Sequence, residues 1–147
     1  MGGKIVHKLK IQKPISFLVA GISSHEKIFI VSNELNRLFN IKLDGLQTID
    51  SLKGDTLKHF NAYSYTSEES GFLYSIISNR GSEGVLADNY RTLDYFFIIS
   101  GESKPVTENL FINKMKSSKL FLAVSYLDIN SPKEIKLFQE IVNQLWS

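Results

Sequence analysis

The sequence predicts one α+β domain spanning residues 1–147, with a single mixed, largely antiparallel sheet and about three helices packed mainly on one face. Three observations predict this class. Residues 93–99 form the most apolar run, and their aromatic and β-branched side chains are typical of a strand buried on both faces. Residues 58–66 and 72–79 are strand-like and separated by turn residues, which indicates a hairpin. Three further stretches carry apolar residues at helical spacing.

The composition is that of an ordinary globular domain, with 43% hydrophobic and 22% charged residues. The net charge of +2 neither predicts nor excludes an acidic partner, because a local patch matters more than a total. The chain has no cysteine, which excludes a disulfide framework, a thiolate metal site and a cysteine nucleophile. No apolar run approaches the roughly 20 residues of a membrane-spanning helix, so we expect a soluble cytoplasmic protein without a membrane partner.

The first third of the chain predicts two strands and a helix. Residues 4–11 alternate loosely, which indicates an edge strand with lysines on one face, and residues 17–22 predict a short apolar strand. Ser23–Glu26 then matches a capping box, in which the Ser23 hydroxyl accepts a hydrogen bond from the Glu26 amide. Apolar residues at helical spacing follow from Ile28 to Phe39, and Asn40 is the expected stop.

The middle of the chain is expected to hold the hairpin and the central strand. Residues 41–43 predict a short strand before the hairpin. Residues 46–56 show no clear period and are expected to form a loop. Residues 79–84 predict a flexible loop after the hairpin, and the chain then returns to the central strand at Leu93.

The last third predicts a helix, a strand and a second helix. Pro105 suits the first turn of a helix. The buried side of this helix is expected to consist of Leu110, Phe111 and Met115. Residues 119–127 predict an apolar strand, and the order strand, helix, strand implies a parallel crossover. Ser131–Glu134 is a second capping box, from which the last helix extends to the C-terminus.

The sequence offers no recognisable metal or catalytic motif. His7, His25 and His59 lie far apart and lack the spacing of a zinc helix. The serines beside His25 lack the Gly-x-Ser-x-Gly elbow that exposes a nucleophile, and helix capping accounts for them. We therefore expect no cofactor, no metal and no catalytic residue, and the balance favours a protein that is not an enzyme.

Asp94, which opens the central strand, has two interpretations. A buried carboxylate with a shifted pKa would mark a functional site. A polar residue at a strand end, hydrogen-bonded to nearby backbone amides, would be structural. The structural interpretation is favoured.

The final helix is the favoured candidate for a partner surface. Leu137, Ile141 and Trp146 widen its apolar side beyond what one sheet face covers. The excess would suit another protein or a second copy of the chain. The simpler interpretation is a helix that only packs on the sheet, with Trp146 at the edge of the core.

Nucleic acid is the alternative partner. The predicted hairpin carries Tyr63 and Tyr65, whose rings could stack on bases, and the predicted N-terminal strand carries Lys8 and Lys10, which could meet phosphates. Aromatic side chains that alternate along a strand more often pack against helices, and this favours the protein partner.

Several stretches, once placed in order, resemble the small bacterial family of Bacteroidota named after its IPExxxVDY motif. The residues that carry the resemblance are Gly21–Lys27, Leu35–Leu38, Ile77–Arg80 and Leu93–Tyr95. It covers about residues 8–127, although Ala87–Asn89 stands where the motif has Ile-Pro-Glu. The resemblance implies a small cytoplasmic bacterial domain and carries over no catalytic residue.

The function favoured by the sequence is a non-enzymatic protein-interaction or regulatory module. An RNA-associated accessory protein that uses the 58–79 hairpin and the N-terminal lysines is the first alternative. An enzyme whose site is assembled from distant residues is the second.

Overall fold

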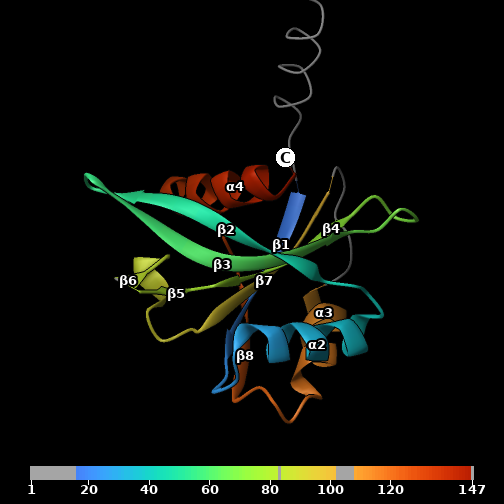
Figure 1. Ribbon diagram of the computed structural model, residues 1–147. Coiled ribbons are helices and arrows are strands. Elements are labelled where there is room, and N and C mark those ends of the chain that lie inside the picture. The colour runs from blue at the N-terminus through green and yellow to red at the C-terminus, as the bar shows by residue number, and fades with distance from the viewer. Residues whose placement is uncertain (1–15, 83, 102–107, 147) are drawn as a thin grey trace, which may run out of the picture.

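The computed structural model describes residues 16–82, 84–101 and 108–146, and its centre is a six-stranded sheet between helices (Figure 1). The strands of this sheet are β1 (Ser16–Ser23), β2 (Asp44–Lys53), β3 (Thr56–Thr66), β4 (Leu73–Ser78), β7 (Tyr95–Gly101) and β8 (Ala123–Leu127). The helices are α2 (Ile28–Phe39), α3 (Glu108–Lys116) and α4 (Pro132–Trp146), and a 3-10 turn, η1, covers Asp88–Tyr90.

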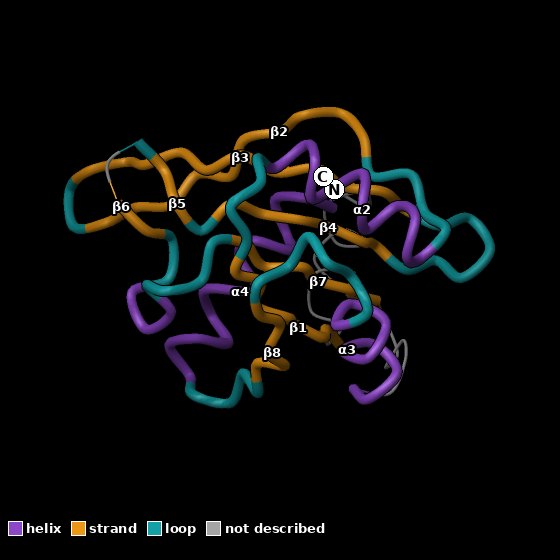
Figure 2. Tube along the Cα trace, turned by 90° about the horizontal axis from the view of Figure 1, so that it is seen from below, coloured by secondary structure: helices purple, strands orange, loops and turns teal. Residues whose placement is uncertain are grey.

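The strand order across the sheet is β2-β3-β4-β7-β1-β8, which is also the order seen in Figure 2. Every pairing between these neighbours is antiparallel. The predicted α+β class with a largely antiparallel sheet is therefore confirmed. The strands β7 and β8 run in the same direction with β1 between them, so the predicted crossover passes over one strand.

The predicted central strand lies in the middle of the sheet. All seven residues of β7 are buried, and β7 pairs with β4 on one side and β1 on the other. Successive side chains of a strand point to opposite faces, so β7 contributes to two hydrophobic clusters. Phe97 belongs to the cluster under α2 and α3, whereas Phe96 and Ile98 belong to the cluster under α4.

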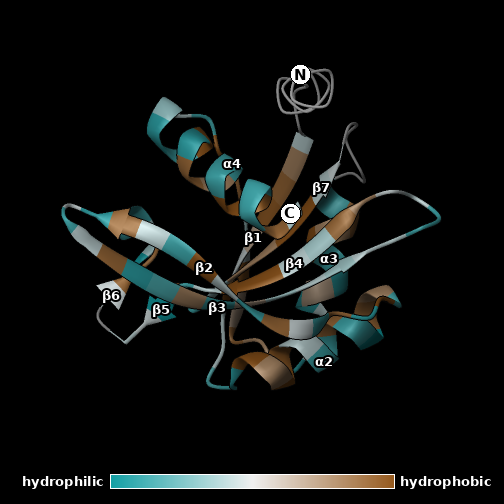
Figure 3. Cartoon of the chain, turned by 45° about the horizontal axis from the view of Figure 1, so that its top comes forward, coloured by the Kyte–Doolittle hydropathy of each residue, from teal (hydrophilic) through white to brown (hydrophobic). Residues whose placement is uncertain are grey.

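Two helices cover one face of the sheet and the third covers the other (Figure 1). Val31 and Leu35 of α2 and Phe111 of α3 pack on the first face. Phe138 and Val142 of α4 pack on the second. Figure 3 shows hydrophobic residues along β1 and β7, between these layers, and hydrophilic residues on the outer turns of α4.

The first predicted capping box is wrong. The helix begins at Ile28 with Lys27 as its N-cap, and no side chain caps it. The chain stays extended through Ser23 because Ser23 pairs with Ala123 of β8. The predicted stop at Asn40 is confirmed, since Asn40 adopts the left-handed conformation with φ of 53°. The second capping box is also confirmed, because the Ser131 hydroxyl accepts a hydrogen bond from the Glu134 amide at 3.3 Å.

The predicted loop over residues 46–56 is wrong, because residues 44–53 form β2 and pair with β3. Residues 41–43 form no strand. The side chain of Asn36 bonds the Leu43 amide at 2.7 Å and its carbonyl at 3.3 Å. The expected 79–84 loop holds a small ribbon of β5 (Arg80–Gly81) and β6 (Gly84–Val85).

In the second helix, Phe111 and Met115 are buried as predicted, but Leu110 is 67% exposed. The predicted strand over residues 4–11 and the helix start at Pro105 lie outside the described residues.

Candidate functional site

Two clusters of polar side chains among the described residues differ in how many of their polar groups are hydrogen-bonded within the protein. The first is the junction, defined by Ser24, Asn79, Arg80, Asp94 and Tyr95, where the end of β1 and the end of β4 meet the start of β7. The second is the groove, a hollow of about 380 Å³ between α4, β2 and η1.

Asn79 is the centre of the junction and is fully buried. Its side-chain amide donates to the carbonyls of Tyr90 and Leu93, each at 2.8 Å, and its Oδ1 accepts from the Ala87 amide at 3.0 Å. Its backbone amide donates to the Asp94 carbonyl at 2.9 Å. Asn79 therefore holds the loop of residues 86–93 against the sheet.

Asp94 bonds to two chain segments that lie far from it in sequence. Its carboxylate accepts from the Ser24 amide at 2.9 Å and from Nε of Arg80 at 2.8 Å. Nη2 of Arg80 donates to the Arg91 carbonyl at 2.9 Å. The bond from the Ser24 backbone amide is the kind of contact that the structural interpretation of Asp94 predicts.

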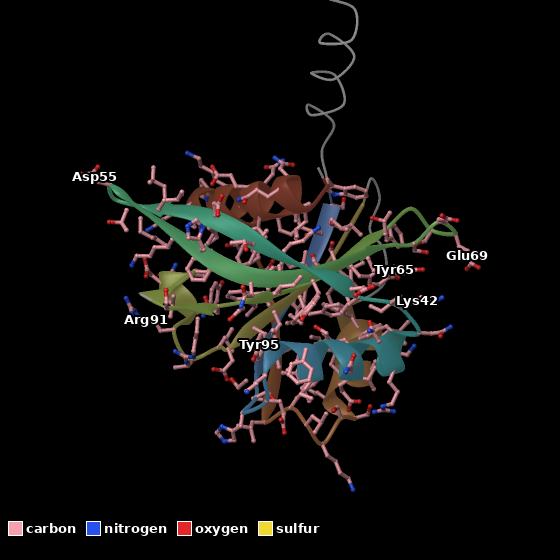
Figure 4. The ribbon with its side chains drawn as sticks, viewed as in Figure 1. Lys42, Asp55, Tyr65, Glu69, Arg91 and Tyr95 are labelled. Atoms are coloured by element: carbon pink, nitrogen blue, oxygen red, sulfur yellow. The ribbon has the colours of Figure 1, made fainter. Side chains whose placement is uncertain are left out.

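Tyr95 completes the junction on the side of α2. Its hydroxyl donates to the Glu26 carbonyl at 2.6 Å, and Figure 4 shows the side chain beside the start of α2. Burial, followed by the charges of Asp94 and Glu26, raises the pKa of Tyr95. Leu93 packs directly on Gly21, where an added Cβ would lie 2.3 Å from Leu93 Cδ1. Gly21–Lys27, Ile77–Arg80 and Leu93–Tyr95, three of the four stretches that carry the resemblance, thus meet here.

The groove has walls from three elements. Residues 51–53 form the β2 wall, and residues 87–90 form the η1 wall. The α4 wall consists of Lys133, Glu134, Lys136, Leu137 and Glu140, which recur at the three- and four-residue spacing of one helix face.

Some polar groups of the groove are paired within the protein. The Tyr90 hydroxyl donates to Glu134 Oε2, and Ser131 donates to Glu134 Oε1 at 3.1 Å. Burial, then the hydrogen bond and charge of Glu134 and the charge of Asp128, raises the pKa of Tyr90 to about 12. Nζ of Lys53 donates to the Leu86 carbonyl at 2.6 Å and lies 3.8 Å from Asp88.

Other groups of the groove lack such partners. Within the described ranges, the side chains of Lys133, Lys136 and Glu140 make no hydrogen bond or ion pair with another residue. Leu52, which also lines the groove, is 67% exposed. The groove therefore presents charges and an apolar side chain that the domain does not use for its own packing.

The three residues of the predicted partner surface on α4 lie in three different environments. Leu137 is half-buried and lines the groove. Ile141 is 2% exposed and packs in the cluster under α4, so it is not part of an accessible surface. Trp146 is 39% exposed at the other end of the helix. Only Leu137 of the three belongs to the groove.

The two tyrosines predicted to contact nucleic acid lie on the opposite face of the sheet. Tyr63 and Tyr65 are half-buried against the cluster under α2 and α3, and Tyr65 stacks on Tyr74 with ring centroids 6.3 Å apart. Figure 4 places Tyr65 towards the Glu69 end of the hairpin, away from Asp55 at the opposite end. Lys8 and Lys10 lie outside the described residues.

A third polar contact, on α2, is also internal. The buried carboxylate of Glu34 accepts two hydrogen bonds from Arg37, at 2.7 and 3.0 Å, and one from Ser118. The bond from Arg37 is the main reason that the pKa of Glu34 lies below 4.5.

Among the described residues, no buried side-chain nitrogen or oxygen lacks a hydrogen-bond partner, and no cluster of His, Cys, Asp and Glu could hold a metal ion. None of the described helices is both long and apolar enough to cross a membrane.

Sequence reasoning missed the groove because it missed β2, which forms one wall. The turn residues Gly54-Asp55 between Leu52 and Leu57 were the signal that could have revealed the hairpin. The apolar residues of β2, Leu46, Ile49 and Leu52, stand three apart, so the sequence lacks the alternation that marks a half-buried strand.

The sequence matches no protein-family model and no curated protein. Membership of the IPExxxVDY family therefore stays a prediction.

Proposed function

We propose that this protein is a non-enzymatic, cytoplasmic interaction module that docks onto another protein through the groove. The observation that carries this proposal is the set of unpaired charges on one face of α4, beside the exposed Leu52. A protein–protein contact combines an apolar anchor with polar groups at its rim, and the groove presents both. The lack of cysteine supports a reducing compartment.

The junction supports this proposal by elimination. Asp94, Ser24 and Asn79 are the polar residues that an enzyme assembled from distant parts of the chain would be expected to use. Their hydrogen-bonding groups are engaged with backbone and with Arg80. A general base or nucleophile needs a lone pair directed at substrate, and these contacts favour a structural role instead.

The contacts of the hairpin tyrosines favour a role in packing the domain over a role in binding RNA. Stacking on a base requires an accessible ring face, whereas Tyr65 and Tyr74 pack on each other and Tyr74 packs on Phe97. We therefore keep the RNA-associated function as the alternative outcome of the experiment below.

The test compares two leucine variants of the full chain. L52S/L137S removes the leucines that line the groove, and L110S removes from α3, on the other face, a leucine as exposed as Leu52. Thermal unfolding establishes that each variant is folded. Affinity purification from the native cell, with and without nuclease, then measures the amount of associated protein, and sedimentation measures self-association.

We expect L52S/L137S to remain folded and to lose its associated protein or its self-association, while L110S keeps both. Equal association in the two variants would contradict the groove as the interface. Association that nuclease abolishes would favour the RNA alternative. W146S, tested in parallel, establishes whether the interface extends to the end of α4.

A further inference from the structure

The outer edge of β2 is covered at one residue by a side chain from α4. The Asp50 amide donates to Gln144 Oε1 at 2.9 Å, and Gln144 Nε2 donates to the Asp50 carbonyl at 2.9 Å. A carboxamide that makes both bonds to one residue replaces the peptide group of a neighbouring strand. Gln144 thus protects an edge that would otherwise present open backbone groups.

The next outward-facing residue of this edge has no such cover. Backbone groups of a strand alternate in direction, so the amide and carbonyl of Leu52 face the same side as those of Asp50. Leu52 pairs with Leu57 across the hairpin, in the same type of pair that Asp50 forms with His59. Within the part of the chain that the structure describes, no side chain or loop bonds the Leu52 backbone as Gln144 bonds Asp50.

The charges beside this open edge are mainly positive. The side chains of Lys133 and Lys136 line the groove and are unpaired among the described residues. Asp88 and Glu134 are already engaged by Lys53, Arg91, Tyr90 and Ser131. Glu140 is also unpaired and lies one turn further along α4. The unpaired side chains of the groove therefore carry a net positive charge.

We propose that the groove binds a short, extended, acidic segment of a partner protein, which adds to the edge of β2 at Leu52. The segment accepts from the Leu52 amide and donates to its carbonyl, as in strand addition to other sheet edges. Its acidic residues lie against Lys133 and Lys136, and its alternate residues, which are apolar and point to the opposite face of the sheet, cover Leu52. This inference rests on the proposed docking function and names the class of partner.

The test uses two synthetic peptides and the full chain. One peptide alternates glutamate with valine, and the other alternates lysine with valine. The variant K133E/K136E reverses the charge of the groove. The control K116E/K119E makes the same charge change on the exposed end of α3 and the segment after it. Binding is measured by titration at low salt, and the site is measured from the chemical shift of the Leu52 amide.

The acidic peptide should bind the parent and the control, and it should shift the Leu52 amide. K133E/K136E should bind it at least tenfold more weakly and should instead prefer the basic peptide. Acidic binding that survives the charge reversal, or binding that leaves the Leu52 amide unshifted, would overturn the proposal. So would failure of the parent to bind the acidic peptide.

Failure of the inference and failure of the docking function have different signatures. If L52S/L137S loses its associated protein but no peptide binds at Leu52, the groove is an interface and the class of partner is wrong. If the parent self-associates through this edge, sedimentation gives a dimer whose Leu52 amide is protected, and the partner is a second copy. That result would also overturn the acidic-segment proposal.

Discussion

The junction and the groove both concentrate polar residues, yet they use them in opposite ways. At the junction, Asn79 and Asp94 bond to backbone groups of Ser24 and of the loop of residues 86–93, and Asp94 also bonds to Arg80. In the groove, Lys133, Lys136 and Glu140 have no partner among the described residues. The difference shows that polar density alone does not locate a functional site. A candidate site is distinguished by polar side chains that make no hydrogen bond or ion pair within the protein.

The largest effect is expected from Asn79→Ala, which tests whether the junction is structural. The change leaves two carbonyls and one amide without the bonds that Asn79 makes. Because each buried, unpaired group costs roughly 1–3 kcal/mol, we expect a loss of about 3 kcal/mol in the free energy of unfolding. Denaturant titration measures it. A loss below about 0.5 kcal/mol, the scale of an ordinary surface substitution, would contradict a stabilising role for the hydrogen bonds of Asn79.

Asp94→Ala should have a smaller effect. It removes the acceptor for the Ser24 amide and for Arg80, whose side chain is 52% exposed. We expect a cost of about 1–2 kcal/mol, mainly from the backbone bond, because water replaces an exposed ion pair cheaply. Asp94→Asn keeps an acceptor and is the matched control, with an expected cost under about 1 kcal/mol. If Asp94→Asn were as costly as Asp94→Ala, the charge rather than the hydrogen bond would be the important contact.

Tyr90 lies between the two regions and gives a pH-dependent test. Its pKa is raised from 10.0 to about 12, so the folded state holds the hydroxyl proton more tightly than the unfolded state does. The resulting stability is fully present below pH 10 and is lost as the pH rises towards 12. Tyr90→Phe should therefore show a shallower fall in stability over this range, measured by thermal unfolding at each pH. Parallel curves for the two proteins would contradict the Tyr90–Glu134 contact.

The smallest effect on stability is expected from K133E/K136E. Both lysines are exposed and unpaired among the described residues, so the change should alter the free energy of unfolding by less than about 0.5 kcal/mol. Denaturant titration of this variant beside Asn79→Ala compares the groove with the junction directly. A large loss of stability in K133E/K136E would mean that the groove lysines serve the fold.

The sequence was informative wherever one short segment determines the structure. The apolar run of β7 and the helical spacing of α2 and α4 are local signals, as is the capping box at Ser131. The cap assigned to Ser23 failed because pairing with β8, a segment about one hundred residues away, keeps Ser23 extended. Long-range strand pairing outweighed a local pattern there.

The sites depended on contacts that no local pattern reveals. Arg80 and Asp94 are fourteen residues apart, and Ser24 and Asp94 are seventy apart. The groove needs β2, whose sequence lacks alternation, beside α4 from the other end of the chain. Leu137 was identified from helical spacing alone. Ile141 was assigned to the same surface because spacing gives the apolar side of a helix but not how much of it the sheet covers.

Amide hydrogen exchange on the full chain without a partner tests most directly the claim that the junction is closed and the groove is open. The Ala87 amide is bonded to Asn79 in a buried position, whereas the Leu52 amide faces outward from the β2 edge. We predict that Ala87 exchanges only as the whole domain unfolds, and that Leu52 exchanges orders of magnitude faster. Equal protection of the two amides, or faster exchange at Ala87 than at Leu52, would contradict the account.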